Sequence, residues 1–130
     1  MSNLENKNII ITGASGGIGN AIIKKLYEAG ANILASGTRM EKLEELKKNF
    51  ENIKILKFDI AQSEKIEDFI EKATNELNGS LDGIINNAGV TQDNLAIRMS
   101  LGEWQKVINI NLTSTFLMSK FAIKKMLKNK

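Results

Sequence analysis

A glycine-rich segment near the N-terminus has the spacing and the setting of a phosphate-binding turn. Residues 12–19 read TGASGGIG, follow the apolar run Asn8–Thr12 and precede a segment of helical periodicity. Glycines placed between a strand and a helix are typical of dinucleotide-binding loops, although the glycines alone would also suit a plain turn. We expect Gly13 to permit the tight turn, Gly17 to let the backbone approach a pyrophosphate, and Gly19 to let the helix pack close to the sheet. Free amides and the positive helix end would meet the phosphate charge.

A second polar motif, NNAG at residues 86–89, follows the fourth expected strand. In an open parallel sheet, ligands bind at the carboxyl ends of the strands, where the strand order reverses. The first and fourth strands flank that point if the order is 3-2-1-4. Asparagine side chains there can bridge neighbouring loops, and Gly89 would leave room for a cofactor. Alone, the motif would more often be a simple turn, but its pairing with the glycine-rich segment favours a binding site.

The composition excludes several kinds of chemistry. The chain has no cysteine and no histidine, so thiolate catalysis, Ser-His-Asp catalysis and nearly all zinc or iron sites are excluded, and we expect no metal. Acid–base chemistry would have to use Asp, Glu, Lys or the single tyrosine, Tyr27. The formal net charge is only +3, and the basic groups mostly alternate with Glu on helical stretches. Both observations argue against a nucleic-acid partner.

No segment approaches the roughly 20 apolar residues that a membrane span needs. The first eight residues are polar and lack the apolar region of a signal peptide. We therefore expect no membrane association and a cytoplasmic location.

Short apolar runs alternate with longer helical stretches, which predicts an α/β fold with a doubly wound parallel sheet. Lysines in the third run predict that this strand lies at an edge. The spacing predicts capping boxes at Thr38/Glu41 and Ser100/Glu103, a helix capped by Ser63, and helix ends near Gly30 and Gly79. Residues 90–99 are expected to form a loop. The expected strands are Asn8–Thr12, Ile33–Ser36, Ile53–Phe58 and Leu81–Asn86.

The last expected helix begins after Ser100 and runs to about Leu127. Its apolar residues do not form one stripe but go most of the way round, so it needs several partners. One partner is its own sheet, and the other is a second subunit or the rest of a larger domain. Its end is basic, with lysines at 120, 124, 125, 128 and 130.

TGASGGIG followed by NNAG resembles the short-chain dehydrogenase/reductase family, and the resemblance covers the whole chain. The stretch Asn86–Met99, NNAGVTQDNLAIRM, is similar to the family's reductases of 3-oxoacyl-(acyl carrier protein). The resemblance implies a Rossmann-type fold. It also implies that Asn111 is the asparagine of an Asn-Ser-Tyr-Lys tetrad, which holds a water linked to the catalytic lysine. Asp59 and Ile60 match a pair that touches adenine, and Asn87 matches a residue whose backbone contacts the adenine ribose.

The resemblance further implies a reaction, which is NADPH-dependent reduction of a 3-oxoacyl thioester on acyl carrier protein in fatty-acid synthesis, by a homotetramer. The family's Ser, Tyr and Lys follow the long helix. We therefore expect residues 1–130 to be an NADP-binding half-domain, truncated after that helix and inactive alone. The alternatives are a reductase of another carbonyl compound, a non-catalytic NADP-binding module and a fragment that binds nothing.

The end of the second expected strand favours NADP over NAD. NAD enzymes place an acid there to hold the ribose 2′-hydroxyl, whereas residues 35–39 read ASGTR. Thr38 and Arg39 can meet a 2′-phosphate by hydroxyl and guanidinium. Many NADP-dependent relatives have Arg or Lys where this chain has Gly16. The expected NADP(H) site comprises Gly13, Ala14, Ser15, Gly16, Gly17, Ile18, Gly19, Thr38, Arg39, Asp59, Ile60, Asn87, Ala88 and Gly89.

Overall fold

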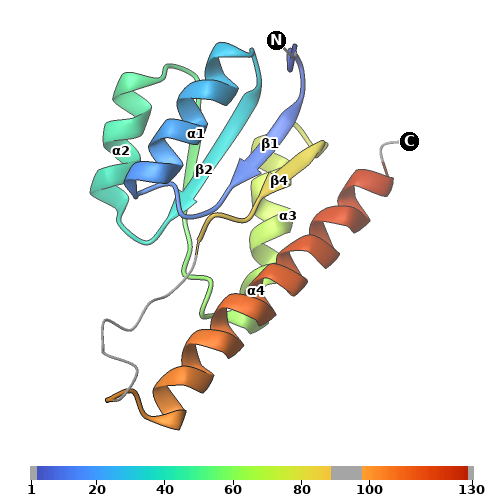
Figure 1. Cartoon of the computed structure of the whole chain (residues 1–130). Helices are drawn as coiled ribbons and strands as arrows, with labels where there is room; N and C mark the ends of the chain where they lie inside the picture. Colours follow the sequence, from blue (N-terminus) through green and yellow to red (C-terminus); the bar gives the residue numbers. More distant parts are fainter. Residues whose placement is uncertain (1–2, 89–97, 129–130) are drawn as a thin grey trace.

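The computed structural model describes residues 3–88 and 98–128 (Figure 1). Four parallel strands form one sheet in the order β3-β2-β1-β4, which confirms the predicted fold class and strand order. The strands are β1 (Asn8–Ile11), β2 (Asn32–Gly37), β3 (Lys54–Lys57) and β4 (Gly83–Ile85). The helices are α1 (Gly17–Glu28), α2 (Met40–Asn49), α3 (Ile66–Glu76), which follows a 3-10 turn (Ser63–Lys65), and α4 (Leu101–Leu127).

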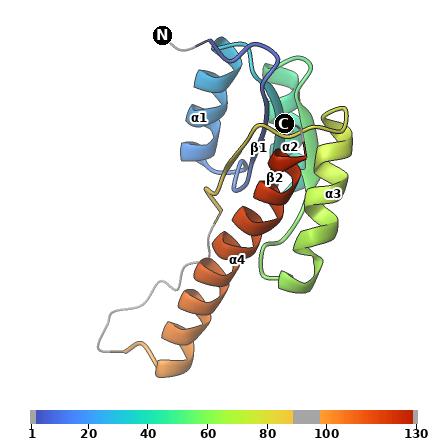
Figure 2. The ribbon, with the colours of Figure 1, turned by 90° about the vertical axis from the view of Figure 1, so that its right-hand side faces the viewer.

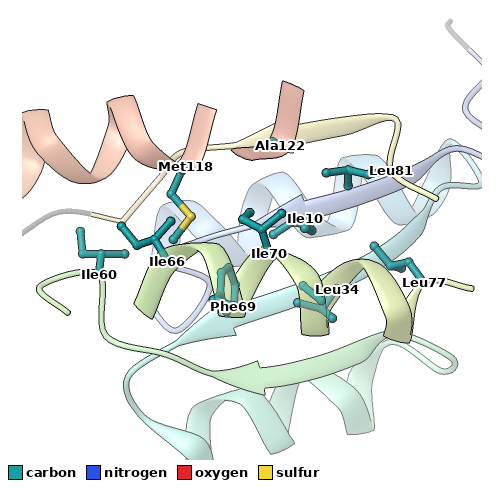
Figure 3. Packing of buried hydrophobic residues seen from close by; sticks show 11 residues of the cluster. Ile10, Leu34, Ile60, Ile66, Phe69, Ile70, Leu77, Leu81, Met118 and Ala122 are labelled. Carbon is teal, nitrogen blue, oxygen red and sulfur yellow. The ribbon is translucent and has the colours of Figure 1, made fainter. Parts of the chain in front are cut away.

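The sheet separates two apolar cores because successive strand side chains point to opposite faces. Ile11 of β1 belongs to the core beneath α1 and α2, together with Ile23 and Leu43. Ile10 belongs to the other core, beneath α3 and α4, where it meets Ile70. Figure 3 shows this second core from close by, with Ile10 between side chains of α3 and α4. Burial of both faces explains why the central strand β1 carries three consecutive isoleucines, Ile9 to Ile11.

The third strand lies at an edge of the sheet, as its lysines predict. β3 pairs only with β2 among the described residues. Lys54 and Lys57 are exposed at its two ends. Charged side chains on an edge strand discourage pairing with another chain.

Two of the three predicted helix starts differ in the structure. Ser100 accepts a hydrogen bond from the Glu103 amide at 3.0 Å, and the Glu103 carboxylate completes the predicted box. The predicted box at Thr38 is wrong, because α2 begins at Met40 with Arg39 as its N-cap residue, which leaves Thr38 outside the helix. The predicted Ser63 cap is also wrong. Ser63 opens a 3-10 turn, and the α-helix begins only at Ile66.

The predicted helix ends at Gly30 and Gly79 are confirmed. Both glycines follow a helix and have positive φ, 91° and 88°, which costs glycine little. The expected loop at residues 90–99 lies, up to residue 97, outside the described residues.

The long helix α4 lies beside α3 (Figure 2), and its first turns extend beyond the sheet in both views. It buries Ser114, Met118 and Ala122, which recur at helical spacing and face the core. Within residues 3–88 and 98–128, no helix is both long enough and apolar enough to cross a membrane.

Candidate functional site

The two sequence motifs meet at the carboxyl ends of β1 and β4. The Thr12 hydroxyl oxygen accepts hydrogen bonds from the backbone amides of Asn87 (3.1 Å) and Ala88 (3.0 Å). The Asn87 side-chain amide donates to the Gly13 carbonyl oxygen at 3.0 Å. The strand order makes this possible, because β4 is the direct neighbour of β1. Three hydrogen bonds therefore join the glycine-rich turn to Asn87 and Ala88 of the NNAG motif.

Gly13 occupies a conformation and a space that no other residue fits well. Its φ is +68°, and a Cβ there would lie 2.7 Å from the Ala88 backbone. Positive φ and a close backbone approach are the two features that favour glycine. The tight turn expected at Gly13 is therefore present, and its close neighbour is the NNAG segment.

The glycine-rich turn closes on itself at Gly19. A Cβ at this position would lie 2.5 Å from the Gly13 carbonyl oxygen and 2.8 Å from the Ala14 Cα. The close packing expected of Gly19 is thus made against the turn rather than against the sheet. Ala14 is buried in the turn and donates its amide to the Ser36 carbonyl oxygen at 2.8 Å.

The middle of the turn is open. A Cβ at Gly16 or Gly17 would meet nothing within 4 Å. Helix α1 begins at Gly17, and no side chain caps its first amides. A negatively charged group can therefore approach this backbone and the positive end of the helix.

A cavity of about 550 Å³ lies over the turn and the ends of the strands. This volume falls in the range of small-molecule sites. Of the expected site residues, those that line the cavity are Gly13, Ser15, Gly16, Gly17, Ile18, Gly19, Thr38, Arg39, Asp59, Ile60, Asn87 and Ala88. Ala14 lies behind the turn and does not line it, and Gly89 lies outside the described residues.

The cavity also has lining residues that the sequence analysis did not single out, namely Thr12, Ser36, Gly37 and Phe58. Gly37 ends β2, and a Cβ there would lie 2.7 Å from the Ser15 Oγ. Phe58 stacks on Phe69 of α3, with ring centroids 4.5 Å apart. Thr12 carried the clearest signal, since it is the one hydroxyl between the apolar strand and the first glycine.

Among the described residues that line this cavity, two have charged side chains, Arg39 and Asp59. The Arg39 guanidinium is exposed and donates through Nη2 to the Ser15 carbonyl oxygen at 3.1 Å. The Asp59 carboxylate accepts from the Ala61 amide at 2.9 Å. The end of β2 presents Thr38 and Arg39 and carries no acid, as the sequence indicates.

Asn111 is not among the residues that line the main cavity. It lies on α4, where its carbonyl oxygen accepts from the Ser114 hydroxyl at 3.1 Å. Asn109 instead lines a smaller cavity of about 160 Å³ between α4 and the 3-10 turn. The expected catalytic role of Asn111 stays a prediction.

Comparison with known proteins assigns this chain to a family. The family model for short chain dehydrogenases matches residues 7–130. The chain belongs to the short-chain dehydrogenase family. Among solved structures, a short-chain dehydrogenase/reductase of Brucella melitensis, titled glucose/ribitol dehydrogenase, superposes with a TM-score of 0.85. It is 29% identical, and the match covers 97% of this chain and 53% of that one.

The curated relatives of this chain include several 3-oxoacyl-[acyl-carrier-protein] reductases. The chain is 42% identical to the 3-oxoacyl-[acyl-carrier-protein] reductase FabG of Rickettsia conorii, over all of this chain and 52% of that protein. It is 37% identical to the FabG of Aquifex aeolicus, over 98% of this chain and 53% of that protein. The chain thus spans about half the length of the curated relatives that it matches.

Alanine substitutions at two turn glycines distinguish a glycine needed for packing of the turn from one that faces open space. We expect Gly19→Ala to lower the free energy of unfolding by about 1–3 kcal/mol, because its Cβ has no room against the turn backbone. Gly17→Ala is the matched control. Its Cβ meets open space, so it should not destabilise the chain, and alanine's helix propensity favours it. Urea unfolding measures both variants, and an equal loss in both would contradict this packing.

Proposed function

We propose that this chain is the cofactor-binding half of an NADPH-dependent 3-oxoacyl-(acyl carrier protein) reductase. The observation that carries the proposal is the cavity of about 550 Å³ formed where Asn87 and Ala88 are bonded to the glycine-rich turn, with open backbone at Gly16 and Gly17. The similarity to reductases of this name supports the substrate class.

The residues of the cavity fit a dinucleotide phosphate. The first amides of α1 would bind the pyrophosphate, and Thr38 with Arg39 would bind the 2′-phosphate. Asp59 and Ile60 would contact the adenine, and the Asn87 backbone would contact its ribose. When bound, NADPH would supply the hydride for reduction of the 3-oxo group.

The 130 residues contain one tyrosine, and it is not at the site. Tyr27 lies on α1, where its ring packs on Phe50 with centroids 5.2 Å apart, and it does not line the cavity. A carbonyl reduction needs a proton donor near the developing oxyanion. The family's Ser, Tyr and Lys follow the long helix, so we propose that the donor lies outside these residues and that Asn111 holds the water of the proton path.

We propose that α4 meets a second copy of the chain within a homotetramer. The exposed side chains Trp104, Ile108, Leu112 and Phe116 recur every four residues, and Leu101, Ile123 and Leu127 are exposed as well. Leu112 and Phe116 are 68% and 64% exposed. A continuous apolar surface of this kind is typical of an interface.

We further propose that the basic end of α4 attracts the acidic acyl carrier protein by long-range steering. Lys120 and Lys124 hold their ammonium groups over the Phe121 ring, 5.3 and 5.6 Å from its centroid. Lys125 is paired with Glu71 of α3, and its hydrogen bond and charge lower the pKa of that carboxyl. Among the described residues, Lys120, Lys124 and Lys128 form no ion pair, although the charge of Lys128 also lowers the pKa of Glu71. As a separate point, we propose a cytoplasmic location for the protein.

A short-chain reductase of another carbonyl compound is the second candidate function. The Brucella melitensis glucose/ribitol dehydrogenase structure also resembles this chain, over 97% of its residues. The NADPH test below does not separate the two candidates, because both use the same cofactor cavity. The test with acyl carrier protein does separate them.

Removing the Arg39 guanidinium should reduce the preference for the phosphorylated cofactor. We expect Arg39→Ala to raise the Kd for NADPH about ten- to a hundredfold, since a hydrogen bond to a charged group contributes about 1.5–3 kcal/mol. NADH should weaken much less. Titration calorimetry with both cofactors measures this, with Lys48→Ala as the control for loss of one charge on α2. Equal losses for NADPH and NADH would exclude the assignment.

The 130-residue chain should not turn over NADPH with an acetoacetyl thioester, because Tyr27 is remote from the cavity. The measurement is NADPH absorbance over time at a concentration of chain that binds the cofactor. A Tyr27→Phe variant is the control for contamination. Steady oxidation by the original chain that Tyr27→Phe abolishes would contradict this account.

Charges introduced on the exposed face of α4 should weaken self-association. We expect Leu112→Glu with Phe116→Glu to shift the chain to a smaller species, because glutamate cannot be buried there without a partner. Light scattering gives the mass. Met40→Glu on α2 is the control, since Met40 is 41% exposed and lies on another helix. A chain that is already monomeric would rule out this interface.

Reversing charge at the basic end should weaken binding of the acyl carrier protein. We expect Lys124→Glu with Lys128→Glu to raise the Kd, and the binding of the original chain to weaken as salt is added. Lys24→Glu with Lys25→Glu on α1 makes the same charge change elsewhere and should have less effect. Equal Kd values for both pairs would indicate that the end of α4 is merely solvated.

A further inference from the structure

A second cavity, of about 310 Å³, lies between the glycine-rich turn and α2. Ser15, Gly16, Gly17 and Arg39 line both this cavity and the main one. The two cavities therefore meet along the turn, and Arg39 stands at their junction. The second cavity also has Lys42 in its wall.

The main cavity has less positive charge than the ligand proposed there requires. Among the described residues that line it, Arg39 is the one cation. A phosphate monoester carries about −1.5 to −2 charges at neutral pH. One guanidinium, which also donates to the Ser15 carbonyl oxygen, leaves part of that charge uncompensated.

Lys42 is placed to supply the missing charge. It lies in the first turn of α2, three residues after the N-cap residue Arg39, and both residues line the second cavity. Its ammonium lies 3.9 Å from the Glu45 carboxylate, with the two side chains 44% and 65% exposed. An exposed ion pair of this kind contributes little to stability, so the ammonium is readily available to a stronger anion.

Resting on the NADPH assignment above, we propose that Lys42 is a second specificity-determining residue for the 2′-phosphate, acting from the second cavity together with Arg39. Gly16 leaves the space between the two cavities open, since a Cβ there would meet nothing within 4 Å. The effect is selective because NADH carries a neutral hydroxyl where NADPH carries the phosphate. Glu45 competes for the same ammonium and reduces the preference.

The experiment measures Kd for NADPH and for NADH by titration calorimetry on the original chain and three variants. We expect Lys42→Gln to weaken NADPH about fivefold and NADH less than twofold. Glu45→Gln should tighten NADPH relative to NADH. Lys47→Gln, which removes the same charge from α2 outside both cavities, should change the ratio of the two Kd values less than twofold.

A rescue variant distinguishes a direct charge effect from damage to α2. Gly16→Lys places its Cβ in open space and should restore the NADPH preference in the Lys42→Gln background. If Arg39→Ala abolishes the preference while Lys42→Gln leaves it unchanged, the role of Lys42 is wrong and the NADPH assignment stands. If the original chain binds NADH as tightly as NADPH, both fall.

Discussion

The hydrogen bonds of one hydroxyl group hold the site together. Thr12 Oγ1 accepts the amides of Asn87 and Ala88, which would otherwise be exposed donors at the end of β4. With the Asn87 side chain on the Gly13 carbonyl oxygen, these bonds fix the distance between two loops that are 74 residues apart in sequence. Gly13 tolerates that distance because it has no Cβ.

The rest of the fold supports this arrangement because large apolar residues fill the cores and small residues lie at the carboxyl ends of the strands. Isoleucines and leucines of the strands fill the two cores on either side of the sheet. Glycine, alanine and serine collect at the carboxyl ends, where the backbone has to turn and stay accessible. Asn86 adds a link in the other direction, because its side-chain amide donates to the Ser119 hydroxyl of α4 at 3.2 Å. The site is thus tied to the helix that carries the exposed apolar face.

Much of this could be predicted from sequence because it depends on local pattern. Apolar runs and glycines placed the four strands, and the lysines of β3 placed the edge. The Ser100/Glu103 box is local as well, and it formed as expected. Thr38 failed as a cap because it lies in the bend between β2 and α2, where it lines the cavity, and Arg39 occupies the N-cap position instead. Ser63 failed because a 3-10 turn precedes α3.

Other features depend on contacts between distant segments, which a pattern in one segment does not reveal. The hydrogen bonds of Thr12, the fit of Gly37 against Ser15 and the stacking of Phe58 on Phe69 all join separate elements. Likewise, the sequence contains Lys42, but only the fold shows that it shares a cavity with Arg39 and the glycine-rich turn.

The most direct test of the account is an NMR titration of the isotope-labelled chain with NADPH, following each backbone amide. The account predicts that the amides of Gly13–Gly19 and of Asn87 and Ala88 shift together with a single Kd. The amides at the opposite end of the sheet, such as those of Asn8 and Asn32, should not move. Shifts confined to one of the two motifs, or absent from both, would contradict the claim that they form one dinucleotide site.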